Sequence, residues 1–286
     1  MLIYGLINSA ILALMALGFN LTFGISGVAN FTYGAIYVVS GFITWTLINH
    51  FVLPYAVSAL LTILLVGISG VYLYRIVLKR IRGLTISEVI ATFGVGLVIL
   101  ELLRYIGFIG FKYSLRPFIK GSVEILDTYV DIQRILIIAF GVILLAVLYL
   151  FTHHTKIGLA FRGIAQDEHT SLSLGINPDR IASYSMGLGS ALGAFSAIAI
   201  LPLGTITVDS GYDVLINALS VCIVGGLGST FGVIIASLII GFAQTVTANY
   251  ISPHWVMIVS LLAILIILAL KPSGLLGHQK ELEERV

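Results

Sequence analysis

The stretch Leu2–Phe23 reads LIYGLINSAILALMALGFNLTF and carries no charged side chain. An apolar run of about 18 residues or more with few charges is long enough to cross a bilayer as a helix. The stretch lacks the positively charged start and the small-residue cleavage site of a secretory signal. We therefore expect it to be a retained first spanning helix.

Eight further apolar stretches follow, and most of them have spanning length. Helices satisfy their backbone hydrogen bonds internally in lipid, and the alternation typical of a β-barrel is missing. The sequence predicts an all-α, polytopic integral membrane protein with about 8–10 transmembrane helices. The stretches are Ala29–Ile48, Leu53–Leu78, Ile86–Phe108, Ile132–Phe151, Ile181–Leu203, Val214–Val224, Phe231–Ala248 and Trp255–Leu270.

The composition excludes a soluble protein. Hydrophobic residues make up 59% of the 286 and charged residues 10%, less than half the roughly 25% typical of soluble domains. The length accommodates a single transmembrane domain over residues 1–286. A net charge of +2 gives no argument for nucleic acid, and the single Cys222 lies in an apolar stretch, where an inert buried thiol is expected.

Two glycine-rich segments interrupt the apolar pattern: GISGVANFTYG at Gly24–Gly34 and GGLGSTFG at Gly225–Gly232. The order Thr-aromatic-Gly occurs in both, at Thr32–Gly34 and Thr230–Gly232. Paired interruptions of this kind indicate an internal repeat around a central binding site, although tight turns between packed helices need glycine equally. The residues expected at structural or pathway turns are Asn30, Gly34, Gly225, Gly226 and Gly228.

Basic residues predict the orientation, because cytoplasmic loops of membrane proteins carry an excess of Lys and Arg. The loop from Ile109 to Gln133 balances its Lys and Arg against acidic residues, which indicates the outer side. Counting nine crossings back from a cytoplasmic tail at 271–286 puts the N-terminus outside. The residues expected in the cytoplasm are Arg75, Lys79, Arg80, Arg82, Lys156, Arg162, Arg180, Lys271, Lys280 and Arg285.

Enzymatic motifs are missing: the sequence has no GxxxxGKS/T phosphate loop, GxSxG elbow, HExxH pair or Cys/His cluster of metal-ligand spacing. We assign no catalytic residue, metal or cofactor to the chain, so any ATP must be hydrolysed by another chain. Glu101 and Arg104, three residues apart, are expected to form an ion pair on one helix face. Glu88 follows Thr85 at capping-box spacing and is expected at a helix start.

With those residues accounted for, the spans hold no carboxylate or histidine relay, which disfavours a proton-coupled carrier; sodium coupling through carbonyl and hydroxyl oxygens stays open. The remaining polar residues are neutral and suit a neutral or zwitterionic solute or, equally, helix packing. The sequence does not indicate which positions bind substrate. These neutral residues are Asn8, Asn20, Asn30, Ser40, Thr92, Ser190, Ser196, Asn217, Ser220 and Gln244.

The segment 153–180 reads HHTKIGLAFRGIAQDEHTSLSLGINPDR and is long for a connector. Its apolar spacing predicts one short amphipathic helix over about Gly158–Leu174, ended by Gly175 as a cap and followed by Pro178 as a stop. Such a helix suits docking on another protein, and a position on the lipid surface is the alternative.

This segment resembles the cytoplasmic loop of branched-chain amino acid ABC transporter permeases, whose pattern is GxAxRAxAxD followed by LxGI. The resemblance is carried by Gly158, Ala160, Arg162, Ala165, Asp167, Leu174, Gly175 and Ile176, with Gly163 in place of the usual Ala. The opening, with Asn30, Phe31 and Gly34, the GGLGS turn and the closing KPSGLLG are similar to the same family. Within the family, the chain resembles the shorter of the two permease types.

The resemblance implies a permease subunit in the cell (inner or plasma) membrane, importing small amino acids, most often Leu, Ile or Val. It implies a second homologous permease, two cytoplasmic ATPase chains that bind ATP and Mg, and an external binding protein. Relatives that carry urea, amides or other amino acids leave the cargo open, and a secondary carrier or a passive channel are the alternatives of another class. The implied coupling residues are Gly158, Phe161, Arg162, Ile164, Ala165, Asp167, Leu174 and Gly175, with Phe161 and Ile164 expected as docking anchors.

Overall fold

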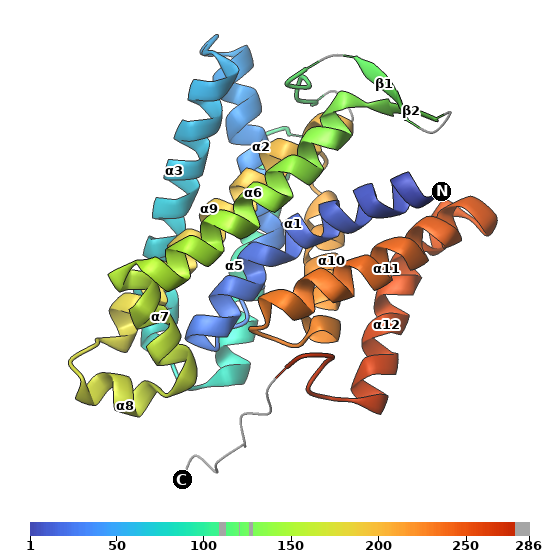
Figure 1. The fold of residues 1–286 in the computed structure, drawn as a ribbon. Coiled ribbons are helices and arrows are strands. Elements are labelled where there is room, and N and C mark those ends of the chain that lie inside the picture. Colours follow the sequence, from blue (N-terminus) through green and yellow to red (C-terminus); the bar gives the residue numbers. More distant parts are fainter. Residues whose placement is uncertain (109–112, 120, 126–127, 278–286) are drawn as a thin grey trace.

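The computed structural model describes residues 1–108, 113–119, 121–125 and 128–277, and this part of the chain is predominantly helical (Figure 1). The apolar stretches predicted from the sequence form helices, which confirms the all-α membrane fold. The long helices are α1 Leu2–Ser26, α2 Tyr33–Asn49, α3 Tyr55–Leu73, α5 Thr85–Tyr105, α6 Ile132–His154, α9 Pro178–Ile200, α10 Ser210–Gly225, α11 Thr230–Tyr250 and α12 Val256–Leu270.

Seven helices of the described residues are long and apolar enough to cross a membrane. One of them extends α3 through a π-helical turn at Tyr74–Leu78 and the short α4 at Lys79–Ile81. The other two predicted stretches form α2, with 17 residues, and α10, with 16. At 1.5 Å per residue they measure about 24–26 Å, short of the roughly 30 Å hydrocarbon core. Seven long spans and two shorter helices thus account for the nine predicted stretches.

The loop between α5 and α6 contains the two strands of the described residues. The strands β1 Ser122–Ile125 and β2 Thr128–Asp131 pair antiparallel, with Val123 opposite Val130. The hydroxyl of Tyr4 at the start of α1 donates to the carbonyl of Tyr129, 3.3 Å away. This hairpin therefore lies over the beginning of α1, and the side of the molecule that carries it is called the hairpin end below.

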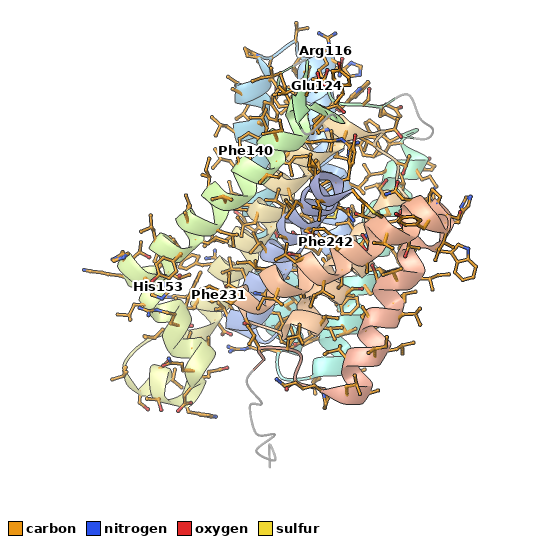
Figure 2. All side chains as sticks on the ribbon, turned by 45° about the vertical axis from the view of Figure 1, so that its right-hand side comes forward. Arg116, Glu124, Phe140, His153, Phe231 and Phe242 are labelled. Carbon is orange, nitrogen blue, oxygen red and sulfur yellow. The ribbon has the colours of Figure 1, made fainter. Side chains whose placement is uncertain are left out.

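Contacts between distant segments show that the nine helices run alternately between the hairpin end and the opposite end. At the hairpin end, the Gln133 side chain at the start of α6 donates to the carbonyl of Ala199 at the end of α9. At the opposite end, the amide of Gly228 before α11 donates to the Oδ1 of Asn20 on α1, 2.9 Å away. The short helices α7 Lys156–Gln166 and α8 Glu168–Ser173 lie at this opposite end, called the α8 end, far from Arg116 and Glu124 at the hairpin end (Figures 1 and 2).

Small residues let the central helices approach closely. Helix α1 packs against both α9 and α11. A Cβ on Gly189 of α9 would lie 2.7 Å from the carbonyl oxygen of Gly18, and one on Gly241 of α11 would lie 2.7 Å from the Cα of Ser9. Close backbone approach through small residues is how helices associate where lipid removes the hydrophobic driving force. This packing explains why α1 and α9 lie at the centre.

The glycine-rich segments connect helices: residues 225–232 turn at the α8 end, whereas Asn30–Gly34 lies against α5, where the amide of Phe31 donates to the hydroxyl of Thr92 at 3.2 Å. Asn30 is buried between α1 and α2, and its Oδ1 accepts the amide of Thr32 at 3.1 Å. Gly34 packs on the backbone of Gly211. Gly226 and Gly228 both have positive φ, +99° and +85°, a conformation that only glycine adopts readily. Both glycines therefore lie in tight turns of the backbone.

The ionisable residues behave largely as expected. Arg104 pairs with Glu101 at 2.8 Å, and it also reaches Asp209 at 2.7 Å before α10. The carboxylate of Glu88 accepts a hydrogen bond from the backbone amide of Gly83 at 2.8 Å, so Glu88 stabilises the start of α5. The side chain of Thr85, its predicted partner, lies outside the described residues. Cys222 is fully buried, as expected of an inert thiol.

Candidate functional site

The loop between α6 and α9 folds into two helices where the sequence predicted one. Thr155 caps α7, its hydroxyl accepting the amide of Gly158 at 2.9 Å. Gly158 is required because a Cβ there would meet the backbone of Phe151 and Thr152 in the last turn of α6. The chain therefore turns sharply from α6 into α7.

The apolar face of α7 packs on the chain itself, so the prediction that Phe161 and Ile164 are free to anchor another subunit is wrong. Phe161 is 1% exposed and Ile164 4%. Both pack with Ile25 of α1 and Ile181 of α9, and the rings of Phe161 and Phe151 lie 5.9 Å apart. The ends of three spanning helices cover this face, a tertiary contact that amphipathic periodicity alone does not reveal.

Asp167 breaks the predicted helix and starts α8. Its carboxylate accepts the amide of His169 at 2.9 Å and the hydroxyl of Thr170. The hydrogen bond from the Thr170 side chain holds the pKa of Asp167 below its ordinary value. Asp167 is thus a helix cap, in the residue class preferred at that position, where the sequence suggested a contact with a partner.

The end of α8 follows the prediction for Gly175. This residue has a φ of +82°, and its amide donates to the carbonyl of Leu172 at 2.9 Å. The amide of Ile176 donates to the carbonyl of Ser171 at 3.0 Å. The two bonds form a Schellman motif, which ends a helix with a left-handed glycine, and Pro178 then opens α9.

Arg82 ties α8 to the rest of the α8 end. Its guanidinium lies 2.6 Å from the carboxylate of Glu168 on α8 and 2.5 Å from that of Asp179 on α9. Partial burial opposes the charge of Arg82, but Tyr74 and these two carboxylates outweigh it and raise its pKa. The cluster of basic residues at 75–82 indicated the side of the membrane but not this ion-pair bridge.

The longest exposed stretch of the loop runs through α8 and the residues that follow it, and Leu159 on α7 is exposed as well. Leu172 and Leu174 are 56% and 77% exposed, large values for leucines beside charged Asp167 and Glu168. Ala165 is partly buried, as is Arg162, whose Nε is buried without a hydrogen-bond partner among the described residues. We call Asp167–Gly175 the α8 surface. It is the largest part of the predicted coupling segment that is accessible to another molecule.

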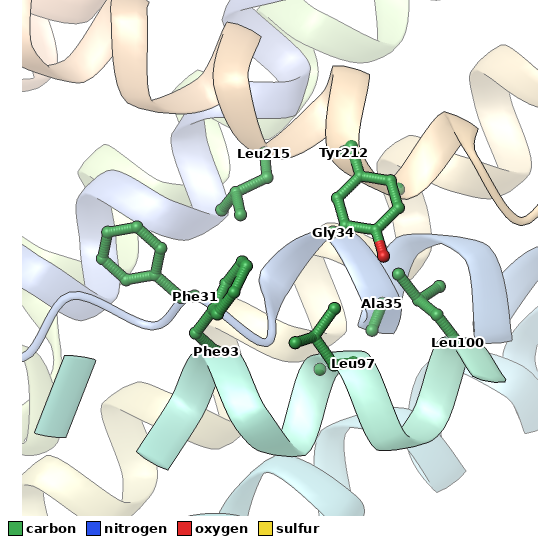
Figure 3. A pocket seen from close by; sticks show the side chains of 10 residues that line it. Phe31, Gly34, Ala35, Phe93, Leu97, Leu100, Tyr212 and Leu215 are labelled. Carbon is green, nitrogen blue, oxygen red and sulfur yellow. The ribbon is translucent and has the colours of Figure 1, made fainter. Parts of the chain in front are cut away.

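A cavity beside the first glycine segment, Gly24–Gly34, is too small for a substrate. Figure 3 shows Phe31, Gly34, Phe93 and Tyr212 around it, with residues from α2, α5 and α10. Its volume is about 10 Å³, at or below the space that one water needs. The segment around Asn30 and Gly34 therefore packs helices together here and forms no binding pocket in this conformation. Across the described residues, His, Cys, Asp and Glu form no group that could hold a metal ion.

Comparisons with known proteins place these features in context. The profile of the family described as "Branched-chain amino acid transport system / permease component" matches residues 1–268. The high-affinity branched-chain amino acid transport system permease protein LivH of Salmonella typhimurium is 24% identical, over 93% of this chain and 91% of its own length. The probable branched-chain amino acid transport permease protein LivH of Methanocaldococcus jannaschii is 27% identical, over 95% and 90%. The permease protein LivM of Escherichia coli is 24% identical, over 92% of this chain and 67% of its own length.

Proposed function

The chain belongs to the branched-chain amino acid transport permease family and is a multi-pass membrane protein; we propose that it is the transmembrane subunit of an ATP-driven importer whose ATPase docks on the α8 surface. The family match over residues 1–268 carries the proposal. The α8 surface supports it, because Arg82, Glu168 and Asp179 hold this exposed helix in a defined position. A rigid exposed element can make different contacts in two nucleotide states, which coupling requires.

The proposed assembly contains this chain as one permease domain, with a second permease, two ATPase chains holding ATP and Mg, and an external binding protein. The similarity to both LivH and LivM types supports pairing of two related permeases. The α8 surface faces the cytoplasm together with the tail from Lys271 onward, as the distribution of basic residues indicates. The hairpin end, with Arg116 and Glu124, then faces outward (Figure 2).

The cargo we propose is a branched-chain amino acid, after the names that the LivH relatives carry. The test is uptake of radiolabelled L-leucine by liposomes that contain the co-purified permease–ATPase complex and its binding protein. We expect uptake with ATP on the ATPase side and none with a non-hydrolysable analogue. Uptake driven by a sodium gradient without ATP would identify a carrier, and equilibration without binding protein a channel. ATP-driven uptake of urea or acetamide in place of leucine would change the cargo alone.

The orientation gives a further prediction. Single cysteines at Lys271→Cys and Arg116→Cys should react with a membrane-impermeant maleimide from opposite sides, because the two residues lie at opposite ends of the nine alternating helices. In intact cells only Arg116→Cys should be labelled, and in inverted vesicles only Lys271→Cys. Both substitutions are made in a Cys222→Ser background, although that thiol is buried. Labelling of both sites from one face would contradict the orientation.

A further inference from the structure

A cavity of about 330 Å³ lies at the hairpin end, between the starts of α1, α6 and α12 and the end of α11. Its volume is within the range of small-molecule sites, roughly 300–1,000 Å³. Its walls are both polar and apolar: Asn8 and Gln244 are polar, Arg134 is basic, and Ile7 and Val256 are apolar. The sequence singled out Asn8 and Gln244 only as neutral polar residues, since nothing in their spacing shows that α1 and α11 bring them together.

A buried hydrogen-bond network fixes the floor of this cavity. The amide nitrogen of Gln244 donates to Asn217 on α10 at 3.0 Å and to Ser260 on α12 at 2.6 Å. Ser260 in turn donates to Asn217 at 2.9 Å. Gln244 and Ser260 are 3% and 0% exposed. A satisfied buried network of this kind rigidifies its members, so the polar groups that it presents to the cavity are held in place.

The amide of Asn8 presents an acceptor to the cavity. Its nitrogen donates to the backbone carbonyl of Gly241 at 3.1 Å and to the Oε1 of Gln244 at 3.0 Å. A backbone carbonyl can only accept, so this contact fixes which end of the Asn8 amide is nitrogen. The Oδ1 of Asn8 receives no hydrogen bond from any residue that the structure describes. It is therefore available to a donor in the cavity, such as an ammonium group.

Arg134 supplies a positive charge to the same cavity. Its Nε lies 3.5 Å from the carboxylate of Asp131, and its guanidinium lies 5.6 Å from the centre of the Tyr4 ring. Within the described part of the chain, its two terminal nitrogens have no hydrogen-bond partner. A guanidinium with a free pair of N–H donors suits a carboxylate, which it can bind through two parallel bonds.

We propose that this cavity binds a zwitterionic amino acid with an apolar side chain, its carboxylate on Arg134 and its ammonium group on Asn8 Oδ1. Ile7 and Val256 then face the apolar side chain. The site takes its substrate class and its position on the outer side from the proposed function. It would receive the amino acid after release from the binding protein and before passage across the membrane.

Direct binding of L-leucine to the permease–ATPase complex in lipid nanodiscs, without binding protein, tests the site. Two analogues each lack one charged group: 3-methylbutylamine has no carboxylate, and 4-methylpentanoate has no ammonium. The wild-type complex should prefer leucine over both. Arg134→Gln should weaken leucine binding about tenfold or more, the value of a charge-assisted pair. It should also abolish the preference over 3-methylbutylamine while keeping the preference over 4-methylpentanoate, and Arg134→Lys should restore part of the affinity.

Arg116→Gln is the matched control, because Arg116 is an exposed arginine at the same end that does not line the cavity. It should bind leucine like the wild type. Two results would overturn this site: unchanged leucine binding in Arg134→Gln, or a phospholipid that native mass spectrometry detects on the wild-type complex but not on Arg134→Gln. In either case, ATP-driven uptake by the wild-type complex would still uphold the proposed function. Absence of ATP-driven uptake in the wild type would instead remove the proposed function.

Discussion

Gly226→Val is expected to remove most of the folded protein from the membrane. Gly226 has a φ of +99° and a ψ of 119°, where a residue with a side chain is strained by about 1–3 kcal/mol, and more when it is β-branched. Its Cβ would also meet the backbone of Leu276 and Gly277. Backbone atoms cannot rotate away, so overpacking adds roughly 1–3 kcal/mol. Together these costs approach the roughly 5–15 kcal/mol that stabilises a typical domain.

The measurement is the yield of monodisperse protein in detergent and its melting temperature. Gly94→Val is the matched control, because Gly94 lies within α5 and a Cβ there meets no atom within 4 Å. We expect a near-normal yield for Gly94→Val and a severe loss for Gly226→Val. Equal yields for the two variants would show that the Gly225–Gly228 turn is an ordinary connection that tolerates side chains.

The sequence could predict the Gly225–Gly228 turn but not its partners. Glycine and small polar residues between two apolar runs indicate a bend whatever lies beside it. In the structure the tail closes on this bend: the amides of Leu275 and Leu276 donate to the carbonyls of Val224 and Gly225 at 2.8 and 3.0 Å. Those contacts join residues about fifty positions apart. Periodicity and propensity are local, so they give helix positions and turns and leave such pairings open.

The same limit explains the error at α7. The spacing of Phe161 and Ile164 gave an amphipathic helix, and this was right. The face was assigned to a partner because no soluble domain was available to cover it. The ends of α1, α6 and α9 cover it instead. Gly175, whose role as a helix cap is a local matter, was predicted correctly, whereas the bridge from Arg82 to Glu168 and Asp179 depends on tertiary structure and was not.

The double variant Leu172→Ala and Leu174→Ala is expected to abolish stable ATPase association. Both side chains are more than half exposed, so their truncation should change the stability of the permease by no more than about 0.5 kcal/mol. Buried at an interface, each leucine contributes about 1.5–3 kcal/mol. Losing both should weaken association by about 100-fold or more. Hydrolysis stimulated by substrate-loaded binding protein should fall with it, while membrane insertion stays normal.

Co-purification of tagged ATPase with each variant measures this effect, with Leu276→Ala as the control. Leu276 is 43% exposed at the α8 end but lies in the tail, outside the α8 surface. Phe161→Ala should behave differently, because truncating a buried aromatic side chain to alanine costs about 3–5 kcal/mol of stability. This variant should lose ATPase binding together with a fall in the melting temperature of the permease. If the double leucine variant retains the ATPase at the wild-type level, the two leucines rest in the lipid surface and the ATPase docks elsewhere. Loss of ATPase at an unchanged melting temperature is what assigns the contact to α8, because only an exposed residue can affect binding without affecting the fold.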